Sequence, residues 1–112
     1  MVDLRVLVAN EPRAYRDAIA AALQELRPNV AVIPVEPHGL DGEIARLDPH
    51  LVVCSRLTEA VQARPLAWVM LYPDGEPWAV MSIAGQHMLV TGIEFQALLA
   101  VLDHTAQLAQ LS

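Results

Sequence analysis

The sequence predicts one α/β domain in which a parallel sheet is covered by helices on both faces. Short, nearly continuous apolar runs alternate along the chain with segments of helical periodicity. Apolar residues make up 54% of the 112 residues, which excludes disorder and is typical of helices packed over both sides of a sheet. The sequence has no repeat, linker or low-complexity tract, so we expect residues 1–112 to form a single domain.

The first half of the chain predicts two strands joined by a helix. Residues 4–9 have the continuous apolarity of a strand that is buried on both faces. Apolar side chains then recur at three- and four-residue spacing over residues 12–28, which predicts an amphipathic helix. The β-branched run 30–35 is the second strand. Pro34 cannot donate a ladder hydrogen bond, so we expect this strand at an edge of the sheet.

The central strand is predicted over residues 49–55. In a doubly wound sheet, chemistry is placed at the carboxyl end of such a strand. We expect a short helix capped by Asp41 before it, another helix over residues 58–64 after it, and a fourth strand over residues 66–72.

The region between the fourth and the last predicted strand, residues 73–88, is atypical. Residues 73–77 predict a turn, and residues 78–83 read as extended rather than helical. A last short strand is expected over residues 88–91, followed by a long helix over about 93–111. The sheet-facing stripe of that helix comprises Phe95, Leu98, Leu99, Leu102, Ala106 and Ala109.

Charge and composition exclude several classes of function. Thirteen acidic and seven basic residues give a net charge of −6, which argues against nucleic acid as a direct partner. The apolar runs are far shorter than the ~20 residues of a membrane-spanning helix. The single cysteine, Cys54, cannot form an internal disulfide, and no leader precedes the first strand, so we expect a cytoplasmic location.

Three stretches of the chain resemble the receiver domain of bacterial response regulators. They are Leu-Arg-Val-Leu-Val-Ala-Asn-Glu-Pro-Arg in the segment 4–23, Asp-Pro-His-Leu-Val-Val-Cys-Ser over 48–55, and Met-Leu-Val-Thr-Gly with the helix that follows, over 88–102. The resemblance implies a flavodoxin-like sheet of five parallel strands in the order 2-1-3-4-5.

The residues that carry receiver chemistry are largely replaced. Active receivers hold Mg²⁺ with two acidic residues, accept the phosphoryl group on an aspartate, and use a Thr or Ser and a Lys nearby. The corresponding positions here are Asn10 and Glu11, Ser55, Tyr72 and Thr91, and only Glu11 keeps its charge. A serine without a neighbouring base is a weak nucleophile and one carboxylate is a poor Mg²⁺ site. The resemblance therefore implies a pseudo-receiver: a signalling module that is not an enzyme, holds no metal or cofactor, and acts by protein–protein contact.

Other functions stay open at this point. A small flavodoxin-like enzyme or ligand-binding domain could use Cys54, Ser55, Glu11 and Tyr72 at the carboxyl ends of the strands. Ser55 could also be phosphorylated by a kinase. Cys54 itself is expected to be a buried structural thiol, since free cysteine is among the most buried residue types.

The last helix carries a second apolar stripe, roughly opposite the first. We expect this stripe to be exposed in a monomer and to form a homodimer or partner interface, because exposed apolar stripes mark interaction sites. Its residues are Ala97, Val101, His104, Leu108 and Leu111.

Overall fold

A computed structural model describes residues 4–64, 66–71, 78–83, 86–91 and 95–111. Its strands are β1 (Arg5–Ala9), β2 (Ala31–Pro34), β3 (Leu51–Cys54), β4 (Ala67–Leu71), β5 (Trp78–Ile83) and β6 (Gln86–Thr91). Its helices are α1 (Arg13–Leu26), α2 (Leu40–Leu47), α3 (Glu59–Ala63) and α4 (Phe95–Leu111), with a 3₁₀ turn, η1 (Pro37–Gly39), before α2. No helix in these ranges combines the length and apolarity needed to cross a membrane.

The six strands form one mixed sheet in the order β2-β1-β3-β4-β5-β6. Strands β1 to β4 pair in parallel, whereas β5 is antiparallel to both β4 and β6. The α/β class and the extended conformation of residues 78–83 are thus confirmed. Strand β2 pairs only with β1 and ends at the exposed Pro34, which confirms the predicted edge.

The prediction of five parallel strands needs correction, and the chain itself explains why. Only residues 72–77 separate β4 from β5, and only residues 84–85 separate β5 from β6. A parallel connection needs a crossover of a dozen or more residues, so both pairs must be antiparallel. The last strand still runs in the direction of β1 to β4, but β5 stands between it and β4.

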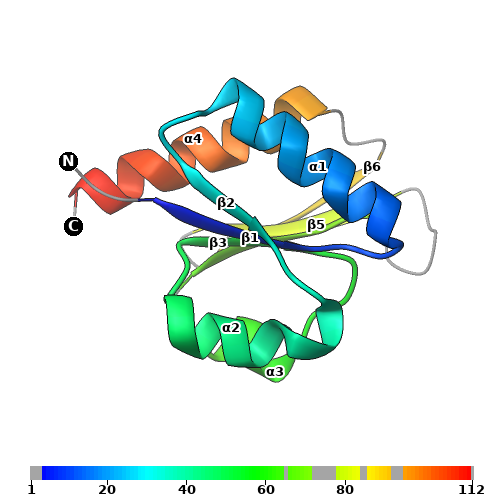
Figure 1. Ribbon diagram of the computed structural model, residues 1–112. Helices are drawn as coiled ribbons and strands as arrows, with labels where there is room; N and C mark the ends of the chain where they lie inside the picture. The colour runs from blue at the N-terminus through cyan, green and yellow to red at the C-terminus, as the bar shows by residue number, and fades with distance from the viewer. Residues whose placement is uncertain (1–3, 65, 72–77, 84–85, 92–94, 112) are drawn as a thin grey trace.

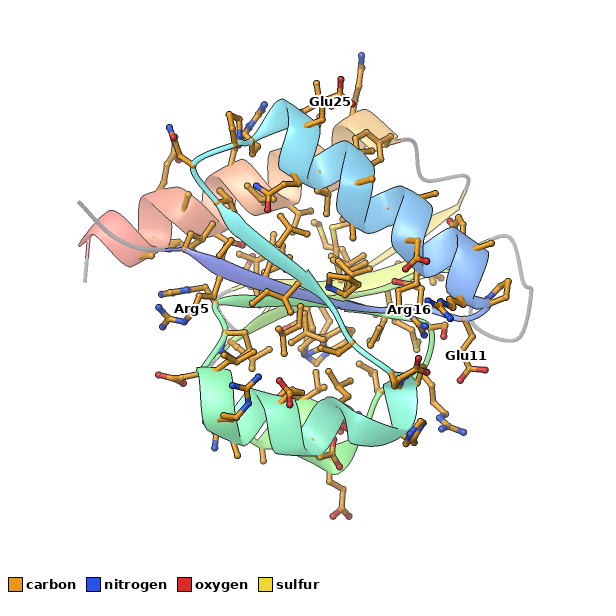
Figure 2. All side chains as sticks on the ribbon, in the orientation of Figure 1. Arg5, Glu11, Arg16 and Glu25 are labelled. Carbon is orange, nitrogen blue, oxygen red and sulfur yellow. The ribbon has the colours of Figure 1, made fainter. Side chains whose placement is uncertain are left out.

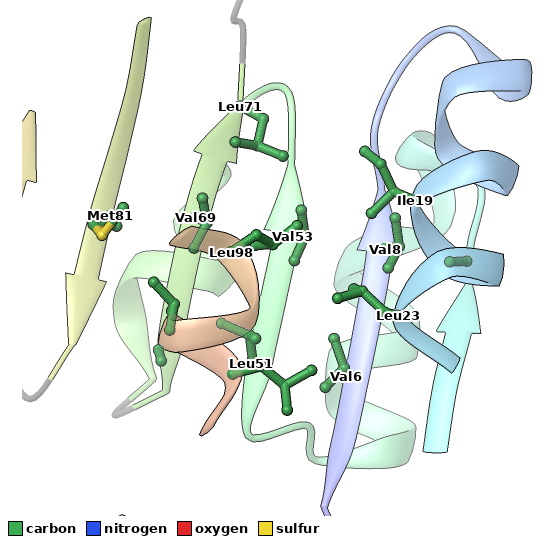
Figure 3. Close-up of a cluster of buried hydrophobic side chains, with 14 of the residues drawn as sticks. Val6, Val8, Ile19, Leu23, Leu51, Val53, Val69, Leu71, Met81 and Leu98 are labelled. Atoms are coloured by element: carbon green, nitrogen blue, oxygen red, sulfur yellow. The ribbon is translucent and has the colours of Figure 1, made fainter. Parts of the chain in front are cut away.

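Alternation along the central strands produces a core on each face of the sheet. On the face covered by α1 and α4, Val6, Val8, Leu51 and Val53 meet helical side chains such as Leu23 (Figure 1 and Figure 3). On the face covered by α2 and α3, the intervening strand residues and their helical neighbours form the second cluster. It comprises Leu7, Ala9, Val35, Leu40, Ile44, Val52, Cys54, Val61 and Trp68.

Helix α4 is covered more fully than the sequence suggests. Leu98 and Leu102 of the predicted sheet-facing stripe are buried as expected, and the rest of that stripe is packed against the core. Val101, however, belongs to the same buried cluster, so the expectation that it is exposed is wrong. Helices α1 and α4 cover the same face of the sheet (Figure 1), and Val101 shares its core cluster with Ile19, Ala20 and Leu23 of α1.

An ion pair ties α4 to the end of α1. Arg27, the residue after α1, donates from Nε and Nη2 to the two carboxylate oxygens of Asp103, at 2.8 and 2.7 Å. This two-pronged hydrogen bonding lowers the pKa of Asp103 below its usual value. The pair therefore links the end of α1 to α4.

The predicted cap of the second helix is also corrected. Helix α2 begins at Leu40, with Gly39 at its N-cap and no side-chain capping bond. Asp41 instead accepts a 2.7 Å hydrogen bond from the hydroxyl of Thr58, whose Oγ1 caps α3 by accepting from the N–H of Val61. Asp41 thus connects the two helices on this face rather than starting one of them.

Two leucines of α1 test how much of the stability comes from its contact with the sheet. Leu23 is 0% exposed and Leu26 is 49% exposed. Replacing Leu23 with Ala should lower the free energy of unfolding by about 2–5 kcal/mol in urea denaturation, because a cavity opens between helix and sheet. The matched change Leu26→Ala should cost less than about 1 kcal/mol. Equal losses would show that α1 is not seated as described.

Candidate functional site

The candidate site lies where β1 and β3 end side by side. Ala9 and Cys54, the last residues of the two strands, are paired across the sheet. The chain leaves β1 toward α1 on one face and leaves β3 toward α3 on the other face (Figure 1). Such a divergence opens a crevice beyond the carboxyl ends of the strands, the usual ligand site of doubly wound sheets.

Two of the predicted site residues meet at these strand ends. The backbone N–H of Glu11 donates a 3.1 Å hydrogen bond to the Ser55 Oγ. The Ser55 hydroxyl is thus already engaged as an acceptor, and the Glu11 side chain is exposed to solvent. The loops after β1 and β3 are joined at this point.

Asn10 is buried beside this hydrogen bond in an unusual state. The residue is 0% exposed, and neither its Oδ1 nor its Nδ2 has a hydrogen-bond partner among the residues that the structure describes. A buried amide without partners costs free energy, so such groups are rare in proteins and call for a specific explanation.

Of the other two predicted site residues, the structure describes only Thr91, which is not brought to this point. Tyr72 lies outside the described residues. The backbone of Thr91 ends β6 and pairs with Trp78 of β5, so the whole width of β5 separates it from β4. The prediction placed Thr91 on a strand beside β4, and the insertion of β5 overturns that placement.

A pocket of about 310 Å³ opens beside Glu11, between the start of α1, the loop after β2 and the loop after β3. Figure 2 shows Glu11 and Arg16 together at this end of the sheet and Arg5 at the opposite end. The lining residues are Glu11, Pro12, Arg13, Arg16, Glu36, Pro37, His38 and Arg56.

Arg16 is the buried charge of this pocket. Its side chain is only 5% exposed, and its Nη2 donates to the Glu36 Oε1 at 3.2 Å, while Glu36 itself is more than half exposed. The ion pair joins α1 to the loop after β2, so the pocket wall is held at both sides.

Cys54 has no nucleophilic character at neutral pH. Its side chain packs into the cluster beneath α2 and α3, and burial raises the pKa of the thiol to about 12, with a smaller opposing effect of the Arg56 backbone. The thiolate is the reactive form of cysteine, so the neutral thiol is inert.

The residues that the structure describes contain no group of three or more His, Cys, Asp or Glu side chains placed to hold a metal ion. Comparison of the chain with protein-family models, with curated proteins and with solved structures gives no match. The site therefore has to be interpreted from its own geometry.

The sequence analysis did not identify the arginines of the pocket, although the position of Arg16 within α1 indicated that it is buried. Arg16 precedes Ile19, Ala20 and Leu23 by three, four and seven residues and therefore continues the buried stripe of α1 by one turn. That spacing could have identified it. Arg56 left no such signal, because only the three-dimensional path of the loop after β3 brings it to Glu36 and Arg16.

The raised pKa of Cys54 predicts a slow reaction with iodoacetamide. At pH 8, the folded protein should be alkylated more than about 100-fold more slowly than the urea-unfolded chain. The rate of the unfolded chain should level off above about pH 8.5, the usual thiol pKa, while the folded rate keeps rising. Intact mass against time measures both, with Cys54→Ser as the control. Similar rates would show that Cys54 is an accessible, activated thiol.

Proposed function

We propose that this chain is a receiver-like signalling module of the bacterial cytoplasm that does not accept phosphoryl groups and acts by contact with protein. In this proposal the order β2-β1-β3-β4 corresponds to the first four strands of the flavodoxin-like order 2-1-3-4-5. The antiparallel pair β5 and β6 takes the place of the fifth strand. Signal transduction or transcription control is the expected setting.

The observation that carries the proposal is the state of Ser55. In the receiver correspondence this position holds the aspartate that accepts the phosphoryl group. Here it carries a hydroxyl that accepts a hydrogen bond from the Glu11 N–H. Glu11 is the single carboxylate among the matched positions, which is too few to hold Mg²⁺ well. The serine and its surroundings support a site that keeps its position but not its phosphorelay chemistry.

The alternative of a small flavodoxin-like enzyme is less well supported than the signalling module. Cys54 would be its strongest nucleophile, but burial and the raised pKa keep this thiol neutral. A ligand-binding role for the same edge is compatible with the proposal and does not require covalent chemistry.

We propose that the protein contact is made through the outer edge of β6 and that the partner is a second copy of the chain. The sheet order ends at β6, whose outer edge is unpaired within the described residues. The opposite edge, β2, is shorter and closed by Pro34. Prolines and charged residues protect an edge strand from pairing with another chain. Strand β6 (Gln-His-Met-Leu-Val-Thr) has no proline and no acidic or basic residue apart from His87.

Side chains on both faces of β6 favour the same contact. Met88 and Leu89 are exposed, Leu89 to 68%, and successive strand residues point to opposite faces. An antiparallel pairing of β6 with its copy satisfies a two-fold axis and covers apolar surface on both faces. Because β6 carries no formally charged residue, pairing it with its copy brings no like charges opposite each other within the two strands. The sequence predicted the dimer interface on the second apolar stripe of α4. We propose the β6 edge in its place, because Val101, at the centre of that stripe, is buried.

Incubation with acetyl phosphate and Mg²⁺ tests the loss of phosphoryl transfer. Intact mass should show no added phosphoryl group, because a serine hydroxyl is a weak nucleophile and Glu11 is the single carboxylate at the matched positions. An intact receiver domain treated in the same way provides the positive control. A hydroxylamine-labile or acid-stable adduct on this chain would contradict the proposal.

Sedimentation velocity tests the contact. The chain should sediment as a dimer at high concentration, and Leu89→Glu should shift it to the monomer by placing a charge at the shared edge. The matched change Leu108→Glu, at an exposed leucine of α4, should leave the dimer intact. A monomer at every concentration, or dissociation by Leu108→Glu alone, would refute the β6 contact.

A further inference from the structure

We infer that the pocket between α1, the loop after β2 and the loop after β3 binds a small ligand through one oxyanion group, a carboxylate or a phosphate. Arg16 and Arg56 are assigned as the groups that hold the oxyanion. The inference goes beyond the proposed function, which requires no ligand, and the two can fail separately.

The charge of the pocket is opposite to that of the chain. All seven basic residues of the chain are arginines, and Arg13, Arg16 and Arg56 line this pocket against the carboxylates of Glu11 and Glu36. With His38 neutral, the lining residues carry one excess positive charge, whereas the chain as a whole carries −6; Arg13 also lies 3.6 Å from the carboxylate of Asp17, which does not line the pocket. A local reversal of sign of this kind attracts anions to the pocket.

Arg16 offers donors that the protein does not use. Its guanidinium has five N–H donors, and the hydrogen bond from Nη2 to Glu36 is the one bond that this side chain makes with described residues. The other nitrogens of the guanidinium are not among the buried polar atoms without a partner, so they remain accessible to water or to a ligand in the pocket. An oxyanion there can accept from them in the two-pronged geometry that arginine prefers.

Arg56 is uncommitted, unlike most of the other arginines. Its side chain is exposed and makes no hydrogen bond or ion pair with the part of the chain that the structure describes. By contrast, Arg27, Arg46 and Arg64 are each paired with a carboxylate. Arg56 is therefore available to a ligand without breaking an interaction of the protein.

Size and charge limit the ligand further. At about 310 Å³ the pocket is at the lower end of the range for small-molecule sites, about 300–1,000 Å³. The single excess positive charge matches one oxyanion group, and Glu11 and Glu36 repel a polyphosphate. A small monocarboxylate or monophosphate fits these limits, and a nucleoside triphosphate does not.

An NMR titration of the ¹⁵N-labelled chain tests the inference. Inorganic phosphate and acetate serve as separate probes, at constant ionic strength set with NaCl, because exposed charges are screened by salt. We expect saturable shifts of the amides of Glu11, Arg13, His38 and Arg56 with at least one probe. The probe that binds more tightly identifies the oxyanion as phosphate or carboxylate.

Two arginine variants make the test specific. Arg56→Ala should weaken binding of that probe by about tenfold or more, as expected for a lost hydrogen bond between charged groups. Arg64→Ala removes an arginine that does not line the pocket and should leave the affinity unchanged. Both residues are exposed, so both variants should fold. The absence of saturable shifts with either probe, or equal affinities of Arg56→Ala and the unchanged chain, would overturn the inference.

Discussion

Burial of the central strands on both faces is the constraint on which the rest of the structure depends. Successive residues of β1 and β3 point alternately into two apolar clusters, so neither face of these strands can carry a polar group at low cost. Polar side chains are therefore displaced to the ends of the strands. The carboxyl edge, where the chain turns to α1 and α3 on opposite faces, is where Asn10, Glu11 and Ser55 are found.

The same constraint explains which parts of the structure could be predicted from the sequence. The strands over residues 4–9 and 49–55 were identifiable because doubly buried strands are continuously apolar. The proximity of Glu11 and Ser55 followed from placing those strands side by side. The apolar runs alone did not reveal strand direction beyond β4, because short apolar runs have the same pattern in parallel and antiparallel pairs. The connections on either side of β5 did carry this information, because they are too short for a parallel crossover.

Helical periodicity was also an incomplete guide to which helical residues are buried, for a related reason. Helical periodicity shows that a residue lies on a face, but not how many neighbours cover the helix. Val101 is buried in a core cluster that it shares with residues of α1, and Arg16 is buried because the stripe of α1 continues toward the carboxyl edge. For Val101 the missing information was the position of α1, whereas the burial of Arg16 could be inferred from its spacing to Ile19, Ala20 and Leu23. The pocket of Arg16, Glu36 and Arg56 depends on three segments that are distant in the sequence.

We propose that this edge keeps the position of a receiver site but not its chemistry: the amide of Asn10 and the hydroxyl of Ser55 stand at two positions where a receiver has carboxylates. Titration of the ¹⁵N-labelled chain with MgCl₂ tests this most directly, because it asks whether the crevice between β1 and β3 still holds a divalent cation. The account predicts that the backbone amides of Glu11 and Ser55 show no saturable shift. Saturable shifts of both amides would mean that the metal site of a receiver persists here and would contradict the account.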